Sequence, residues 1–333
     1  MRNIMKNIKN KRIAILLSVL LISMVITVGC SNTTTLVSEF EGKELFTYIN
    51  DNNSLVIEST DGQIKKTIIE GKANEKMIDY DVCWEEQKVA YIVQSVGSAD
   101  NEEFFTELRL YNLQDDTEAV LHHDDWMIRG VEWSPNKEYI LMDIGTGAIG
   151  SLSLYSIATS DWIKIQDGVF DYSWSPNGEQ IALSVREEVN PQTPVDDGSS
   201  FTTVVLNLKK ENTIQTIMTG TTNFYVSPVT WGDDNTLYIE KRIFGEEQPI
   251  YYKVNVTDNK LVEIDAKELP NQNDSSSYPE EVREVLHEVS PDGTKVLYVK
   301  YSEADEKLKV MLWDATSQVK TELGFGEMPK WVN

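Results

Sequence analysis

A short Trp-Ser-Pro-Asn phrase that recurs between runs of β-forming residues constrains the fold of this chain most strongly. Full copies stand at Trp133–Asn136 and Trp174–Gly178, and Ser290–Gly293 keeps the turn without the Trp. Pro fixes φ, and Asn or Asp followed by Gly supplies the conformations of a tight turn. The apolar runs on either side are typical of antiparallel strands. The sequence therefore predicts a hairpin that is used repeatedly.

The spacing of this phrase predicts the number of repeats. With the Trp position as the marker, copies fall at residues 84, 133, 174, 231, 289 and 331, which are 41 to 58 residues apart. That interval suits one four-stranded propeller blade with its loops. The last marker heads a strand, 328–333, without later partners, whereas 44–50, 54–60 and 65–70 read as three strands without a Trp strand before them. We expect a six-bladed β-propeller of four-stranded antiparallel blades, with one blade closed by N- and C-terminal strands that hide both sheet edges.

The Trp-Ser-Pro-Asn-Gly turn resembles the repeat of the TolB-type propellers, a WD-like family. The resemblance covers about residues 43–333 and is strong at Trp133–Asn136, Trp174–Gly178 and Ser290–Gly293. It implies the fold and not an activity, because propellers host many unrelated functions. A role in the cell envelope like that of TolB is an analogy.

Residues 1–29 read as a signal peptide. Five basic and no acidic side chains precede an apolar run, Ile13–Val28, that is shorter than the roughly 20 residues of a membrane span. The run ends at Cys30 in a sequence similar to a bacterial lipobox, with Thr27 where that motif usually has Leu. We expect lipid on Cys30 and a tether over 30–42 before the propeller at 43–333. An uncleaved N-terminal anchor helix is the alternative; both place the folded part outside the cytoplasm.

The charge of the chain limits its partners. Without the five basic residues of the signal segment, 25 Lys and Arg remain against 54 Asp and Glu, a formal charge of −29. Such a surface repels phosphate backbones and anionic lipids, so it excludes nucleic acid and leaves the lipid to hold the membrane. Solubility is the default interpretation of this charge, and a preference for cationic partners or divalent metals is the alternative. We expect a location at the outer face of the cytoplasmic membrane of a Gram-positive bacterium.

Loop lengths indicate which face of the propeller carries function. The Trp-Ser-Pro turns are short and share one face, whereas the longest expected loops share the other, and binding residues concentrate on loops held by a rigid scaffold. Those loops are 94–103, 122–127, 187–200, 221–225, 242–248 and 267–281. The candidate partner-binding residues within them are His122, His123, Asp124, Asp125, Trp126, Phe224, Tyr225, Arg242, Phe244 and Tyr278.

Metal binding is a weaker expectation for the same loops. Asp124, Asp125, Asp196 and Asp197 offer oxygen ligands that suit calcium, although turn chemistry also explains such residues. Adjacent histidines diverge in an extended chain, so His122 and His123 are poorly arranged to share one transition metal. A hydrated loop pinned by Trp126 is the competing interpretation.

The expected function is binding rather than catalysis. No Gly-x-Ser-x-Gly nucleophile motif occurs, and three histidines are few for a catalytic metal site. We expect a lipid-anchored protein that recognises a protein or a cell-wall glycan through the long-loop face, without a required cofactor. The alternative is a hydrolase or lyase with an acidic, calcium-dependent site. Convergent carboxylates in the channel would favour that alternative, and a dry aromatic patch would favour protein binding.

Overall fold

The computed structural model describes residues 39–40, 42–96, 104–145, 149–186, 200–210, 212–270, 278–279, 282 and 287–332. The chain divides into two units, Met1–Glu41 and Gly42–Asn333, and every named strand belongs to the second. Among the described residues, no helix has the length and apolar character that crossing a membrane requires. Cys30 and the predicted signal segment lie outside the described residues.

Antiparallel strands make up the second unit, with one short 3₁₀ helix, η1 (Ala266–Glu268). Two of its sheets have four strands each, in sequence order. The first contains β4 (Glu75–Cys83), β5 (Lys88–Ser95), β6 (Thr106–Asn112) and β7 (Thr117–Asp124). The second contains β15 (Phe224–Asp233), β16 (Thr236–Ile243), β17 (Ile250–Asn255) and β18 (Lys260–Ile264).

The other two sheets have seven strands each. One contains β8 (Ile128–Trp133), β9 (Tyr139–Ile144), β10 (Gly150–Ser156), β11 (Trp162–Trp174), β12 (Gln180–Arg186), β13 (Phe201–Asn207) and β14 (Thr213–Met218). The other contains β19 (His287–Val289), β20 (Lys295–Ser302), β21 (Lys307–Asp314), β22 (Val319–Trp331), β1 (Leu45–Asn50), β2 (Leu55–Ser59) and β3 (Lys65–Ile69).

Each seven-stranded sheet is two four-stranded groups that share one long strand. The first part of β11 pairs with β10 up to Val169, and its second part pairs with β12 up to Trp174. Likewise β22 pairs with β21 up to Phe325 and with β1 from Gly326 onward. Glycine permits the change of partner, since a Cβ on Gly326 would lie 2.4 Å from the Ile49 carbonyl oxygen.

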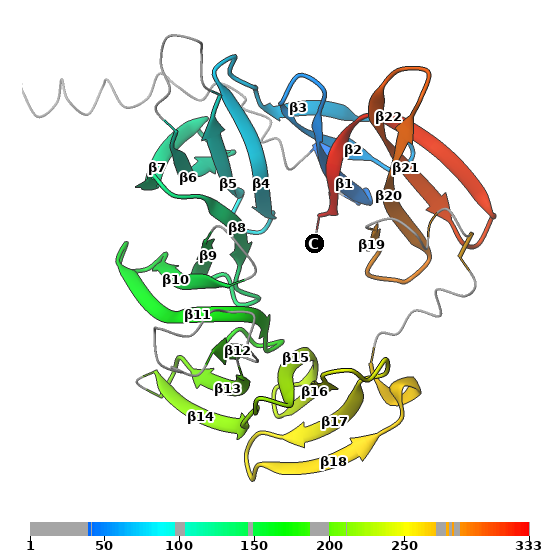
Figure 1. Cartoon of the computed structure of the whole chain (residues 1–333). Helices are drawn as coiled ribbons and strands as arrows, with labels where there is room; N and C mark the ends of the chain where they lie inside the picture. The colour runs from blue at the N-terminus through cyan, green and yellow to red at the C-terminus, as the bar shows by residue number, and fades with distance from the viewer. Residues whose placement is uncertain are drawn as a thin grey trace, which may run out of the picture. The chain divides into compact units, whose positions relative to one another are not determined.

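The predicted pairing of the two ends of the folded unit is confirmed. Phe46 lies opposite Trp331, and Figure 1 shows the red C-terminal strand β22 beside the blue strand β1. The predicted bounds of this last strand are wrong, because β22 begins at Val319 rather than at residue 328. The strand of one group runs on into the next without a loop, so no turn residues mark its start.

The repeated phrase folds identically in its three strong copies. Each Ser hydroxyl oxygen accepts the backbone N–H five residues on, at 2.9 Å for Ser134, 3.0 Å for Ser175 and 2.8 Å for Ser290. The Asn or Asp two residues after each Ser accepts the next-but-one N–H. The residue directly after this Asn or Asp has positive φ, and it is Lys137 in the first copy and glycine in the other two. The phrase is thus a closed turn that joins two strands.

The Trp of the phrase ends an inner strand and packs between neighbouring groups. Trp133, Trp174, Trp231 and Trp331 are buried in four of the core clusters. The marker predicted at Trp84 is wrong by one residue, because Cys83 ends β4, pairs with Lys88 and packs with Trp133. A small buried thiol fills that position, and Trp84 belongs to the turn that follows.

Candidate functional site

Strand direction divides the connections of this unit into two faces. Short turns after β4, β8, β11, β15 and β19 lie on one face, called here the turn face. The opposite face, called the long-loop face, carries the described connections 51–54, 70–74, 125–127, 219–223, 244–249 and 303–306. Most of the predicted loops 94–103, 187–200 and 267–281 lies outside the described residues. Several side chains of the predicted site border the long-loop face from the ends of strands rather than from loops. His122, His123 and Asp124 end β7, Phe224 and Tyr225 begin β15, and Arg242 lies in β16.

Four rings form a contiguous aromatic patch on the long-loop face, in which Phe170, Phe201 and Tyr225 contact one another and Phe244 contacts Tyr225. Neighbouring ring centroids are 5.1 to 6.4 Å apart, and the rings cross at 42° to 80°. Phe170 is 39% exposed and Phe244 is 50% exposed. Exposed rings supported by half-buried ones are the usual anatomy of an anchor for a protein partner. Because the rings are tilted, they do not form the flat platform on which a sugar ring stacks.

Charged groups surround the aromatic patch and include an excess of carboxylates. Arg242 pairs with Glu240 at 2.7 Å, so its charge is paired within the chain. Lys241 lies 4.1 Å from the centre of the Phe224 ring. Glu246 and Glu247 are exposed just after Phe244. The face of the Phe224 ring is thus covered by the ammonium group of Lys241, whereas Tyr225 and Phe244 belong to the aromatic patch.

The His122–Asp125 segment is held by partners within the chain. His122 Nε2 lies 3.2 Å from Asp124 and its ring meets Trp162 edge-on. His123 Nδ1 lies 3.1 Å from Glu107, and its ring stacks on Phe105. The two imidazoles therefore point to opposite faces of β7, as adjacent residues of a strand must. The predicted loop at 122–127 is wrong for its first half, because β6 pairs with β7 as far as Asp124.

The other predicted residues do not share one place in the structure. Trp126 is 64% exposed beside the end of β7 and stays a candidate contact. Tyr278 is 6% exposed and packs on Trp313 at 5.0 Å between centroids, so it belongs to the core and not to a surface. Asp196 and Asp197 lie outside the described residues, and among the described residues no three His, Cys, Asp or Glu side chains are arranged to hold a metal ion.

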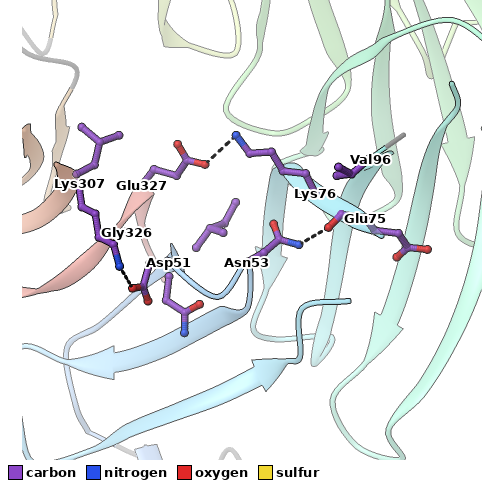
Figure 2. Close-up of a pocket in the computed structure, with 11 residues that line it drawn as sticks. Asp51, Asn53, Glu75, Lys76, Val96, Lys307, Gly326 and Glu327 are labelled. Carbon is purple, nitrogen blue, oxygen red and sulfur yellow. Dashed lines mark hydrogen bonds and ion pairs between the residues drawn. The ribbon is translucent and has the colours of Figure 1, made fainter. Parts of the chain in front are cut away.

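A cavity of about 470 Å³ on the long-loop face lies where β1, β4, β21 and β22 meet. Figure 2 shows Lys307 pointing toward Asp51 and Lys76 toward Glu327, and these ion pairs measure 2.8 and 3.4 Å. Asn53 donates to the Glu75 carbonyl oxygen across the same space. The charges of this cavity are thus paired across the seam between the two ends of the folded unit.

A second cavity, of about 560 Å³, lies between the inner strands and is called here the channel cavity. Carboxyls line it together with two ammonium groups and aromatic rings. Its lining residues include Asp79, Asp81, Glu132, Glu288, Lys137, Lys330, Trp133, Tyr172 and Trp331. They come from β4, β8, β11, β19, β22 and the turn after β8.

Two carboxylates of the channel cavity tie neighbouring groups of strands together. Asp79 accepts the Val131 N–H at 2.9 Å, and Asp81 accepts the Trp133 N–H at 2.7 Å. Lys330 donates to Asp79 at 3.0 Å and to the Tyr80 carbonyl oxygen. These bonds join β4 to β8 on one side and to β22 on the other. Asp79 and Asp81 are therefore engaged in holding the inner strands.

Glu132 is the exception among these carboxyls. Its carboxyl accepts a hydrogen bond from the hydroxyl of Tyr172, and burial, reinforced by Asp81 and Asp79, raises the pKa of Glu132 to about 7. Lys330 and the Tyr172 hydrogen bond oppose the shift without cancelling it. Burial and the Glu132 charge also raise the pKa of the Tyr172 hydroxyl. This carboxyl exchanges its proton near neutral pH.

None of these residues of the channel cavity was among the site residues predicted from the sequence. Glu132, Glu288 and Lys330 each stand directly before the marker position, and Asp81 and Tyr172 stand two residues before it. A polar residue at that place is unusual on a buried inner strand, and this pattern in the sequence could have indicated that these residues line a cavity. Without the strand register, no two of them could be brought together.

No protein-family model and no curated protein matches the sequence. Solved structures do resemble this chain. An oligogalacturonate lyase in complex with manganese gives a TM-score of 0.50 at 10% identity, over 81% of this chain and 73% of that one. TolB from Acinetobacter baumannii gives 0.48 at 14%, over 86% and 66%, and the tricorn protease gives 0.49 at 12%, over 85% and 29%.

The likeness to the lyase structure shows the fold alone. The chain spans about two thirds of the TolB chain and less than a third of the tricorn protease chain. All three neighbours are β-propeller proteins, and identities this low carry no activity or partner across. The chain is an all-β propeller built from four-stranded antiparallel groups.

Proposed function

We propose that this protein is a lipid-anchored binding protein whose aromatic patch receives a protein partner. The observation that carries the proposal is the set of four contacting rings, two of them well exposed, on one face of a rigid sheet scaffold. Exposed apolar clusters of this kind mark interaction sites. The tilt of the rings favours a protein over a glycan chain.

Charge indicates the chemistry of the partner. Glu246 and Glu247 flank Phe244, and the predicted mature chain carries a formal charge of −29. A partner with an apolar anchor and a basic rim complements both features. Opposite charges raise the association rate, and rings that become buried on binding lower the dissociation rate.

The sheet topology supports a count of blades. We infer six blades: β4–β7, β8–β11, β11–β14, β15–β18, β19–β22 and a closing blade of β22 with β1–β3, where β11 and β22 each serve two blades. In this arrangement β1 begins at Leu45 on the turn face.

The experiment is affinity capture from detergent-solubilised membranes, with the chain as bait, followed by affinity measurement with the purified partner. The test variant is Phe170→Ser/Phe244→Ser. The control is Ile214→Ser/Val262→Ser, which removes two equally exposed apolar side chains from β14 and β18. We expect the test variant to lose at least tenfold in affinity, as for loss of a binding hot spot, and the control to bind normally. Equal binding by both variants would refute the proposal.

The hydrolase or lyase alternative would act in the channel cavity, where carboxyls do converge. Two of the four are engaged by backbone N–H groups, and Glu132, whose pKa is raised to about 7, is the carboxyl best suited to proton transfer. Turnover of a glycan or peptide that is abolished by Glu132→Gln would replace the binding proposal with this one.

A further inference from the structure

One carboxylate beside the aromatic patch has no cation to balance it. Asp171 directly follows Phe170 in β11, and its side chain is open to solvent. It accepts hydrogen bonds from neutral groups, the Tyr172 backbone N–H at 2.9 Å and the Ser227 hydroxyl at 3.4 Å. In the part of the chain that the structure describes, no Lys or Arg pairs with Asp171, and the charge that acts on it is the carboxylate of Glu240.

Protein atoms crowd Asp171 although water reaches it. Burial raises the pKa of this carboxyl, the charge of Glu240 adds to the rise, and the two hydrogen bonds only oppose it. Glu240 is itself compensated, because Arg242 donates to its two oxygens at 2.7 and 3.2 Å. Asp171 is therefore the uncompensated negative charge at this place.

A β-bulge turns Phe170 and Asp171 toward the same neighbouring strand. Consecutive side chains of a regular strand point to opposite faces, but the register of β11 with β12 shifts between Val169 and Asp171, and a bulge re-aims side chains. The Phe170 ring lies 5.9 Å from the Tyr225 ring, between centroids, and Asp171 meets the hydroxyl of Ser227. Tyr225 and Ser227 are two residues apart on β15 and share one face of it. The exposed ring and the carboxylate thus stand side by side.

We propose that Asp171 sets the specificity of the aromatic patch by receiving an arginine side chain of the protein partner, whose guanidinium lies against the exposed ring of Phe170. This inference rests on the proposed partner surface and adds the chemical group that this surface selects. A planar guanidinium stacks on an aromatic face and donates two parallel N–H bonds to a carboxylate. It is less strongly hydrated than an ammonium group, so a crowded carboxylate favours Arg over Lys.

Selection from a random peptide library displayed on phage tests the proposal on the full chain. The parent protein should enrich peptides that carry an arginine beside apolar residues. Asp171→Asn should enrich apolar peptides without the arginine, and Phe170→Ser/Phe244→Ser should enrich neither kind. The control is Asp167→Asn, which removes the same charge from an exposed position of β11 where Lys164 already pairs with it. This control should enrich the same arginine peptides as the parent.

An enriched peptide and its citrulline analogue then separate charge from shape, because citrulline is a neutral isostere of arginine. On the parent, citrulline should weaken binding by about tenfold or more, as for loss of a charged hydrogen bond. On Asp171→Asn the two peptides should bind within about twofold of each other, since the interaction is already lost there. The comparison on the parent uses the unaltered protein, so it does not depend on the folding of a variant.

The outcomes distinguish this inference from the proposed partner surface. Peptides that require the rings but not an arginine, or that accept lysine equally, would overturn the role of Asp171 and leave the surface standing. Enrichment that Phe170→Ser/Phe244→Ser does not reduce, or no enrichment at all, would refute the surface together with this inference. Equal losses in Asp171→Asn and Asp167→Asn would mean general attraction by negative charge and would also overturn the role of Asp171.

Discussion

Replacing Glu132 by Gln should stabilise the folded protein, and only at neutral and alkaline pH. The pKa of this carboxyl is about 7 in the folded chain, against an ordinary value of 4.5. Below about pH 4.5 the group is neutral in both states and its effect on stability vanishes. Above pH 7 it is charged in both states, and the folded state bears the full penalty.

The size of that penalty follows from the shift. Each pKa unit corresponds to about 1.4 kcal/mol, so the folded state loses about 3 kcal/mol above pH 7, with the loss developing between about pH 4.5 and 7. Gln is neutral throughout and can accept the same hydrogen bond from Tyr172. Glu132→Gln should therefore match the parent at pH 4.5 and exceed its free energy of unfolding by up to about 3 kcal/mol at pH 8.5.

Urea unfolding of both proteins at pH 4.5, 6, 7 and 8.5 measures this difference directly. Glu138→Gln, which alters an exposed carboxyl outside the cavity, is the control and should show no gain that grows with pH. A difference between Glu132→Gln and the parent that is constant over the whole range would refute the reasoning. So would a loss of stability at pH 8.5.

Three further substitutions test the fold and the anchor. Lys330→Met removes the cation from Asp79 and should lower the free energy of unfolding by about 2 kcal/mol in urea titrations; an unchanged midpoint would mean that this bond does not secure the seam. Gly178→Ala adds a Cβ 2.7 Å from the Asn136 backbone nitrogen and should cost about 2 kcal/mol or more, whereas Gly62→Ala, with similar φ but open space, should cost about 1 kcal/mol; equal thermal shifts would contradict the packing argument. Cys30→Ser should move the protein from the membrane fraction to the soluble fraction and abolish fatty-acid labelling, and retention with label intact would refute the anchor.

Much of the fold could be predicted because its repeat is carried by local chemistry. Pro and Asn in Trp133–Asn136 dictate a turn wherever they occur between apolar runs, and the three strands at 44–70 could be assigned from their runs of β-forming residues. The start of β22 could not, because Val319–Trp331 passes from one group to the next without a turn. Continuity of a strand leaves no mark in the sequence.

The candidate sites were less predictable, because they depend on which residues from distant strands meet. Tyr225 and Phe244 could be named from their loop positions, but Phe170 and Phe201 join them only through the register of β11 and β13. Tyr278 has the same composition signal and is buried. Glu132 looks like any charged residue until Asp81 and Tyr172 are placed beside it.

Site-specific photo-crosslinking tests the proposed binding surface most directly. A photoreactive phenylalanine analogue at Phe244 reports what touches the aromatic patch in intact cells, and the same analogue at Val262 reports on an equally exposed position on β18. We predict one discrete crosslinked protein from position 244 and none from position 262. No adduct at 244, or the same adducts at both positions, would contradict a binding role for this face.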